Sequence, residues 1–406
     1  MRRALLALLL ASAAGEAAAA TPDVPVLPPA AEVPGRPAMD EDLPEWVAAR
    51  LGFQRPPPEA DASGKARFTA VPFVISNPLI GAGFGVAGAV SFRAGRAADT
   101  PFSTLGASVL ATTRSQRSVN LRSQLHLPSN DWIFVGDWTA NHFPRPAWGL
   151  GGDQPDAAET TVDMRELKLH ETAYRRLAGP VYAGIGYFLD DDYDLRDVRA
   201  ARGEATPFSA YGYGVAGRTI SSGFAGSLLL DARDNPLDPW RGTYALVRLR
   251  IEPEWAGSEQ SWQSLWVEGR AYLPVAPRAS LALWAYGWSA FGKTPYFMLP
   301  TSGRDPEMRA SRGWIAGRHV GRDLVGAEAE LRVAAWQFLS LALGGSVHAA
   351  SDRDDVRGWP DFNRVWPAAS AGLRLTMDRR SLASLAVDAA WRPGGFTGYV
   401  AFNQAF

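Results

Sequence analysis

The chain has 406 residues, of which 47% are hydrophobic and 20% are charged, a length that allows two or three ordinary domains or one large all-β unit. Its 41 Lys and Arg side chains are balanced by 42 Asp and Glu, so it lacks the basic field with which nucleic-acid-binding proteins neutralise phosphates, and no nucleic acid is expected among its partners. There is no cysteine, which excludes disulfides, thiolate metal sites, cysteine nucleophiles and a lipid-modified N-terminal cysteine.

The N-terminus has the three regions of a secretory signal peptide. A positive start, Met1-Arg2-Arg3, is followed by an apolar run from Ala4 to Leu10 and by the small residues Ala18-Ala19-Ala20, which signal peptidase accepts. An uncleaved anchor would need about 18 apolar residues, and Glu16 interrupts this run. We therefore predict that residues 1–20 are cleaved and that the mature protein leaves the cytoplasm.

Residues 21–66 are rich in Pro, Ala and acidic side chains, a composition typical of an extended linker. We expect this linker to lie in the periplasm and to contain no folded domain. One short helix is expected at about 40–51, because four apolar residues there have helical spacing. They are Leu43, Trp46, Val47 and Leu51.

Alternation with a period of two recurs from residue 67 onward. In the segment 245–252, Val247, Leu249 and Ile251 share one face, and three charged side chains share the other. A soluble sandwich also alternates, but its apolar face is a packed core of large side chains. Here the apolar faces hold many small residues, and the polar faces hold both signs of charge and bulky aromatics. The pattern therefore favours an all-β fold, a transmembrane antiparallel β-barrel with its apolar band facing lipid.

About sixteen strands can be placed, an even number as in single-chain bacterial barrels. They are 68–76, 83–93, 103–112, 117–127, 132–141, 162–175, 180–189, 215–233, 243–253, 262–273, 279–291, 324–335, 338–350, 366–377, 382–392 and 397–406. With the linker in the periplasm, alternate connections fall on opposite sides of the membrane. The long segments 142–161, 190–214, 292–323 and 351–365 are then external, and the short turns are periplasmic, the asymmetry expected of such barrels.

Two segments carry motifs of a known family. Residues 230–244 resemble the D-x-R-D-N-P-x-x-P-x-x-G turn of the BamA/TamA-type barrels, the bacterial surface antigen family. Asn-Pro initiates such a turn and Gly permits a positive φ. The matching residues are Asp231, Arg233, Asp234, Asn235, Pro236, Pro239 and Gly242. In the expected sixth external loop, Ser311-Arg312-Gly313-Trp314 resembles the family's [VI]-R-G-[FY] motif. With weaker matches at 72–85, 148–151, 372–374 and 399–406, the resemblance covers residues 67–406.

The resemblance implies a plugged lumen. In that family the sixth loop folds into the barrel and its Arg pairs with an acidic residue of the wall. This implies the same role for Arg312, with Gly313 allowing close approach and Trp314 packing inside. The strand at 338–350, where the family commonly has an Asp, contains no acid, so we expect the inward-facing Glu328 and Glu330 to substitute for it. The alternative is an exposed loop arginine. The other plug residues that the resemblance implies are Gly317, Arg318, Arg322 and Asp323.

The remaining candidates for chemistry are weaker. The run Asp190–Asp194 lacks calcium-loop spacing and is interpreted as a solvated external loop. The five histidines contain no H-x-x-x-H pair and do not indicate a zinc site. A Ser/His pair across strands stays open, but no G-x-S-x-G string supports a hydrolase. We expect no enzymatic activity, cofactor or metal.

The function that the resemblance implies is assembly or translocation of protein or lipid at the outer membrane of a Gram-negative bacterium. Its surroundings would be outer-membrane lipid and lipopolysaccharide, and its partners client proteins or a separate periplasmic protein. Residues 21–66 are too few for one of the family's POTRA domains, so we expect a short member without them. Val400, Phe402 and Phe406 match the family's C-terminal assembly signal. The alternatives are a passive or gated solute channel, whose charged lumen selects small solutes, and a structural surface protein.

Overall fold

The computed structural model describes residues 39–51, 64–77, 81–96, 99–304, 310–352 and 360–402. The expected signal peptide, most of the expected linker and the C-terminal Phe406 lie outside these residues. Within them, no helix is long and apolar enough to cross a membrane.

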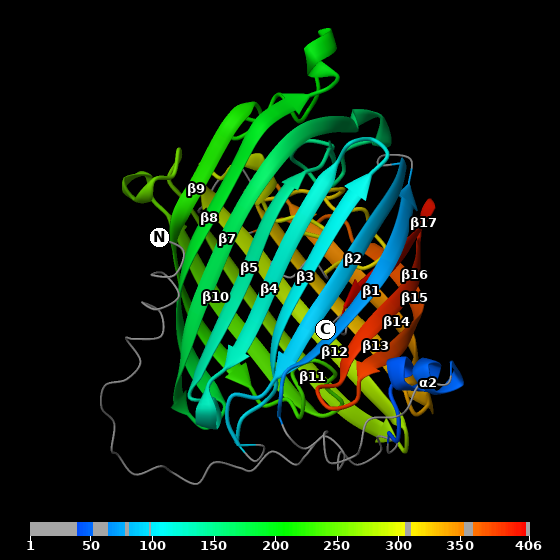
Figure 1. The fold of residues 1–406 in the computed structure, drawn as a ribbon. Helices are drawn as coiled ribbons and strands as arrows, with labels where there is room; N and C mark the ends of the chain where they lie inside the picture. The colour runs from blue at the N-terminus through cyan, green and yellow to red at the C-terminus, as the bar shows by residue number, and fades with distance from the viewer. Residues whose placement is uncertain are drawn as a thin grey trace.

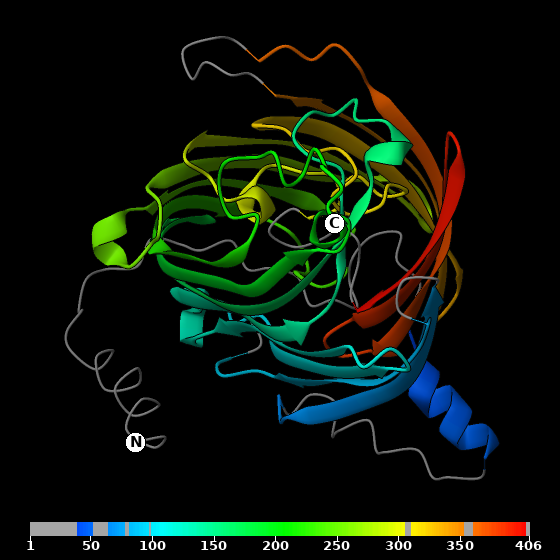
Figure 2. The same cartoon turned by 90° about the horizontal axis from the view of Figure 1, so that it is seen from above.

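The described residues form one antiparallel sheet of seventeen strands, which curls around a central lumen (Figures 1 and 2). The strands are β1 (Arg67–Asn77), β2 (Gly81–Phe92), β3 (Ser103–Thr112), β4 (Arg117–His126), β5 (Trp132–His142), β6 (Arg145–Ala147), β7 (Thr160–Ala178), β8 (Val181–Asp197), β9 (Gly217–Asp231), β10 (Gly242–Glu252), β11 (Trp262–Ala276), β12 (Ala279–Gly292), β13 (Asp323–Trp336), β14 (Leu339–Ser351), β15 (Trp366–Asp378), β16 (Ala383–Arg392) and β17 (Gly395–Phe402). All sixteen expected strands are present, and the short β6 is additional. The predicted all-β antiparallel barrel is confirmed.

Each long strand pairs with the next along the chain. The ladders run in order from β1–β2 to β16–β17, with β5 pairing to β7 and β6 adding a short ladder to β7. This up-and-down connectivity puts alternate connections at opposite ends of the barrel. We call the end with the short β7–β8 and β15–β16 connections the turn end, and the end with the long connections the loop end.

The two faces of the strands differ as the alternation predicts. On β11, Glu268 and Arg270 face the lumen and are only 4% and 5% exposed, whereas Val267, directly before Glu268, is 41% exposed on the outer face. The lumenal face also holds large aromatic side chains, including Trp266, Tyr272 and Trp284, all nearly inaccessible. The interior is therefore packed with charged and aromatic side chains rather than open.

The interpretation of residues 190–194 as a solvated external loop was wrong. These residues continue β8, which runs on to Asp197. Asp190 and Asp192 are buried on the lumenal face, while Asp191, on the opposite face, pairs with Arg218 at 2.7 Å. A run with charges on both faces of a strand looks like a loop in the sequence, because neither face is then apolar.

The expected short helix is confirmed as α2 (Leu43–Arg50), at the lower right of Figure 1. It begins with a capping box, in which the side chains of Asp42 and Glu45 each accept from the other's backbone N–H. The helix packs against the turn end through Trp46, whose ring lies 5.5 Å from that of Phe338. Glu45 also pairs with Arg379 at 3.1 Å. This part of the expected linker is thus attached to the barrel.

Candidate functional site

Residues 293–322 connect β12 to β13, and the described parts of this connection, 293–304 and 310–322, turn inward and lie inside the ring of strands (yellow in Figure 2). We call it the sixth loop. Ser311, Arg312 and Trp314 are 0%, 8% and 9% exposed. Ser311 stands where the related motif has an aliphatic residue, and its backbone N–H donates to the Tyr286 hydroxyl at 3.1 Å. A serine therefore fits this position because a wall tyrosine satisfies its polar groups.

Arg312 reaches three carboxylates of the barrel wall. Its Nη1 lies 2.5 Å from Glu330 Oε2 and 4.0 Å from Asp388 Oδ2, and its Nη2 lies 3.9 Å from Glu328 Oε2. Its carbonyl accepts from Ser346 Oγ at 2.8 Å. The structure thus brings together Arg312, Glu328 and Glu330, and adds Asp388 of β16, which the sequence reasoning missed.

Glu330 is shared among three arginines. Besides Arg312, it accepts from Arg332 Nε at 2.8 Å and from Arg374 Nη2 at 2.6 Å. Arg374 also pairs with Asp388 at 2.7 Å. Three cations and three carboxylates therefore form what we call the lumenal charge cluster, comprising Arg312, Arg332, Arg374, Glu328, Glu330 and Asp388. Buried charges are tolerated only when paired in this way.

The charge state of Arg312 follows from this cluster. Burial by itself lowers the pKa of Arg312, but Glu330, Glu328 and Asp388 outweigh it and leave the pKa above its ordinary value. Arg312 is therefore a permanent cation, and protonation changes cannot release it near neutral pH.

Gly313 is held where a side chain does not fit. Its φ of +104° lies in the region that favours glycine. A Cβ at this position would lie 2.6 Å from the Cβ of Ala368. Its carbonyl accepts from Arg392 Nη1 at 3.1 Å. The loop therefore approaches β15 and β16 as closely as a backbone allows.

A second group of contacts fixes the loop just beyond Gly313. The ring of His319 stacks on Trp366 at 4.0 Å and lies 4.5 Å from Trp314. Its Nδ1 shares a hydrogen bond of 2.8 Å with Nε2 of His348 on β14. We call Trp314, His319, His348 and Trp366 the aromatic group. No H-x-x-x-H pattern marks this histidine pair, because its members are 29 residues apart.

Both histidines of the aromatic group are only 1% exposed. Burial, with the neighbouring His348 and Arg318, lowers the pKa of the loop residue His319 to about 2. His319 is therefore neutral in the docked loop over the physiological range, and the docked loop depends on that neutral state.

The other expected plug residues hold the frame of the loop. Gly317 has a φ of +84° and donates its N–H to Ser302 O at 2.9 Å. Arg318 pairs with the exposed Asp156 at 2.8 Å, and Arg322 donates to Gly292 O at 3.0 Å. Asp323, at the start of β13, accepts from Ser289 Oγ at 2.6 Å. None of these contacts reaches the lumenal charge cluster.

The D-x-R-D-N-P turn connects β9 to β10 at the turn end. Asp231 holds Arg233 through two hydrogen bonds of 2.8 and 2.7 Å, and Arg233 Nη1 donates to Pro236 O at 3.2 Å. Asn235 Oδ1 accepts from the N–H groups of Leu237 and Asp238, as an Asx turn requires. The motif is therefore a self-bonded turn with its own side-chain scaffold.

The remaining turn residues attach it to the barrel. Asp234 Oδ1 accepts from Trp240 N at 3.0 Å, and Asn235 Nδ2 donates to Ser381 O at 3.2 Å. Gly242 has a φ of +108°, and a Cβ there would lie 2.1 Å from Ala232 O. Pro239 O accepts from Arg332 Nη1 at 3.0 Å. Arg332 thus belongs to the lumenal charge cluster and contacts this turn as well.

The C-terminal assembly residues fall at the edge of the described chain. Val400 and Phe402 lie in β17, in register with Val387 and Leu385 of β16. Phe406 lies outside the described residues.

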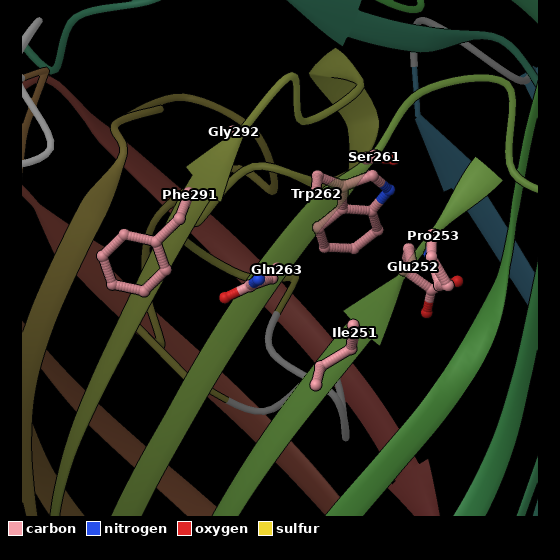
Figure 3. Close-up of a pocket in the computed structure, with 8 residues that line it drawn as sticks. All are labelled: Ile251, Glu252, Pro253, Ser261, Trp262, Gln263, Phe291 and Gly292. Carbon is pink, nitrogen blue, oxygen red and sulfur yellow. The ribbon is translucent and has the colours of Figure 1, made fainter. Parts of the chain in front are cut away.

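A shallow hollow opens at the loop end of β10, β11 and β12 (Figure 3), with Glu252, Trp262 and Phe291 in its wall. Glu252 is paired with Arg250, and Ser261 donates to Glu254 at 3.4 Å. None of the residues that line the hollow is a histidine, cysteine or lysine. In the part of the chain that the structure describes, no group of three or more His, Cys, Asp or Glu side chains is arranged to hold a metal ion.

Comparison with known proteins identifies the fold. No family model and no curated protein matches the chain. Among solved structures, it is similar to BamA from Haemophilus ducreyi lacking POTRA domains 1–3, with 13% identity, a TM-score of 0.50, and coverage of 84% of this chain and 70% of that one. It is also similar to CdiB from Escherichia coli, with 12% identity, a TM-score of 0.50, and coverage of 86% of this chain. The chain spans 63% of that CdiB. The predicted resemblance to BamA-type barrels is confirmed at the level of the fold.

Proposed function

We propose that this protein is an outer-membrane β-barrel of a Gram-negative bacterium that takes part in assembly or translocation of protein or lipid, with the sixth loop as its plug. The fold shared with BamA supports the class of barrel. The observation that carries the proposal is the docked loop, because a plug held by a balanced charge cluster is what the motif resemblance leads us to expect of an assembly barrel.

In this proposal the loop end faces outward and the turn end faces the periplasm. The signal peptide over residues 1–20 brings the chain across the inner membrane. Helix α2 then lies at the periplasmic rim, where a separate periplasmic partner or a client protein arrives. The outer face, with side chains such as Val247, Leu249 and Ile251 each 42% exposed, contacts outer-membrane lipid and lipopolysaccharide.

Energetics favour a plug over an incidental contact. An exposed ion pair contributes only about 0–1 kcal/mol, too little to offset the conformational entropy of a long loop. Removing one partner of a buried pair costs about 3–5 kcal/mol. The Arg312 and Glu330 side chains are 7% and 0% exposed, so this ion pair is a buried one and is strong enough to hold the loop.

The decisive experiment compares wild type with a variant lacking residues 304–322, in two assays. In planar bilayers, we expect the wild type to be nearly closed and the deletion to conduct steadily, because the lumen is filled by the loop. In cells, removal of the whole protein should lower the amount of specific proteins or lipids in the outer membrane.

The same assays identify the alternative. A wild type that conducts steadily, together with an unchanged outer-membrane composition in its absence, would establish a passive or gated channel instead. Arg218→Ala serves as a matched control, since Arg218 pairs with Asp191 at 2.7 Å but is itself 61% exposed and far from the loop in the sequence.

A further inference from the structure

A row of oxygen-bearing side chains crosses four strands on the lumenal face. Asn141 of β5 is in register with Glu166 of β7, Glu166 with Asp192 of β8, and Asp192 with Thr219 of β9. Residues directly opposite across an antiparallel ladder have Cβ atoms about 4.5–5.5 Å apart. The four side chains therefore form one line across the sheet, which we call the oxygen row.

Among the residues that the structure describes, most of the oxygens in this row have no hydrogen-bond partner. They are Oδ1 of Asn141, both carboxylate oxygens of Asp192 and Oγ1 of Thr219. Asp192 and Thr219 are only 1% and 3% exposed. A buried carboxylate without hydrogen bonds costs several kcal/mol. Four unsatisfied oxygens in one place therefore point to a bound cation that these oxygens would coordinate.

Within the described residues, Asp192 has no ion-pair partner. Arg145 pairs with Glu166 at 2.5 Å, and Arg250 pairs with both Asp190 and Glu252. Arg145 and Arg304 act on Asp192 electrostatically, but within the described residues neither forms an ion pair with it. Glu166 and Asp192 are also like charges directly opposite each other, an arrangement that is destabilising and that Arg145 offsets from the Glu166 side.

We propose that the oxygen row of Asn141, Glu166, Asp192 and Thr219 binds a hard divalent cation of the calcium type. Calcium takes six to eight oxygen ligands from carboxylates, amides, hydroxyls and waters in a flexible geometry, which suits a line of two carboxylates, one amide and one hydroxyl. Zinc prefers His and Cys ligands in tetrahedral sites, and the row contains neither. Magnesium demands stricter octahedral geometry and should bind more weakly.

The bound cation would join β5, β7, β8 and β9. These include the longest strands of the barrel, β7 with 19 residues and β8 with 17. A cation there would neutralise Asp192 and stiffen this wall of the lumen. The inference rests on the row alone and stands whether or not the protein assembles other molecules.

The test uses the full-length barrel, folded in detergent micelles free of lipopolysaccharide and treated with a chelator. Calcium is titrated calorimetrically, and thermal unfolding is followed with and without calcium. We expect saturable binding with a Kd of about 0.1–1 mM, the range of extracellular calcium sites, and a calcium-dependent rise in Tm. Asp192→Asn should weaken binding by more than about tenfold.

Asp191→Asn is the matched control, because it removes a carboxylate from the neighbouring position that faces away from the lumen. It should keep the wild-type affinity. Thr219→Val removes one ligand with little change in size, and it provides a second readout if Asp192→Asn folds poorly. It should weaken binding several-fold.

Two results would overturn the proposal. One is a wild-type barrel with no saturable calcium binding in this range. The other is Asp192→Asn and Asp191→Asn with equal calcium-induced shifts in Tm. If Asp192→Asn raises Tm equally with and without calcium, then Asp192 is a strained or protonated carboxyl, and the row is not a cation site.

Discussion

Glu330 accepts from three arginines at once, so the loop contact through Arg312 cannot be removed without affecting its neighbours. We predict that Arg312→Ala and Glu330→Gln each destabilise the docked loop by about 3–5 kcal/mol, the cost of breaking a buried pair, and that each raises the conductance of the barrel. The double variant should be no worse than the more severe single one, because both changes break the same contact.

Conductance of the two single variants and the double variant measures this coupling. Arg218→Ala is the control, because the Arg218 side chain is 61% exposed and its partner Asp191 faces away from the lumen, and it should leave conductance within error of wild type. A strictly additive double variant would show that something other than the Arg312–Glu330 pair holds the loop.

Gly313 allows a second test at the same scale. Gly313→Ala combines a positive φ with a contact of 2.6 Å to Ala368, whereas Gly394→Ala has a φ of +81° and nothing within 4 Å of the added Cβ. The φ strain alone costs about 1–2 kcal/mol, so both variants should lose that much. Only Gly313→Ala should also open the lumen. Equal conductance in the two variants would mean that the close approach to β15 is unimportant.

At the scale of the element, the sixth loop should be sensitive to acid through its histidine. The pKa of His319 is about 2 in the docked loop and about 6.5 when the side chain is in water. Between these values the released loop binds a proton that the docked loop does not. The stabilisation by docking is thus complete above about pH 6.5 and falls by up to about 1.4 kcal/mol for each pH unit below it.

Conductance or protease access to the loop, measured between pH 7.5 and 5, checks this expectation. Wild type should open progressively as the pH falls, and His319→Phe should respond less because it cannot be protonated. His142→Phe is the control, since the His142 side chain is 38% exposed and pairs with Asp163 outside the loop. A pH response unchanged in His319→Phe would assign the acid sensitivity to other groups.

At the scale of the whole molecule, a barrel with a packed interior should resist detergent until heated. We predict that the mature protein fractionates with the outer membrane and migrates faster on a denaturing gel before boiling than after it. Recovery of the protein from the soluble periplasmic fraction would contradict both the outer-membrane location and the prediction that the barrel spans a membrane.

The strands were predictable because apolar and polar side chains alternate over a few neighbouring residues, as around Val247, Leu249 and Ile251. The inward position of Arg312 was predictable only through a motif, since nothing local distinguishes it from an exposed loop arginine. Asp388 and the pair His319–His348 were not predictable, because they meet their partners across the lumen or across ladders far apart in the sequence. Asp190 and Asp192 were misassigned for another reason, since Asp191 between them puts a charge on the outer face as well and removes the apolar face that identifies a strand.

The guanidinium of Arg332 makes two hydrogen bonds, one to Glu330 in the lumen and one to the carbonyl of Pro239 in the β9–β10 turn. A molecule that binds that turn and draws it away from β13 would remove one of these contacts and loosen the hold of Glu330 on the plug. Linkage is reciprocal, so release of the plug would strengthen binding at the turn by the same factor. Binding at the β9–β10 turn and release of the plug would then be linked by one coupling free energy, so a change at either site would shift the equilibrium at the other.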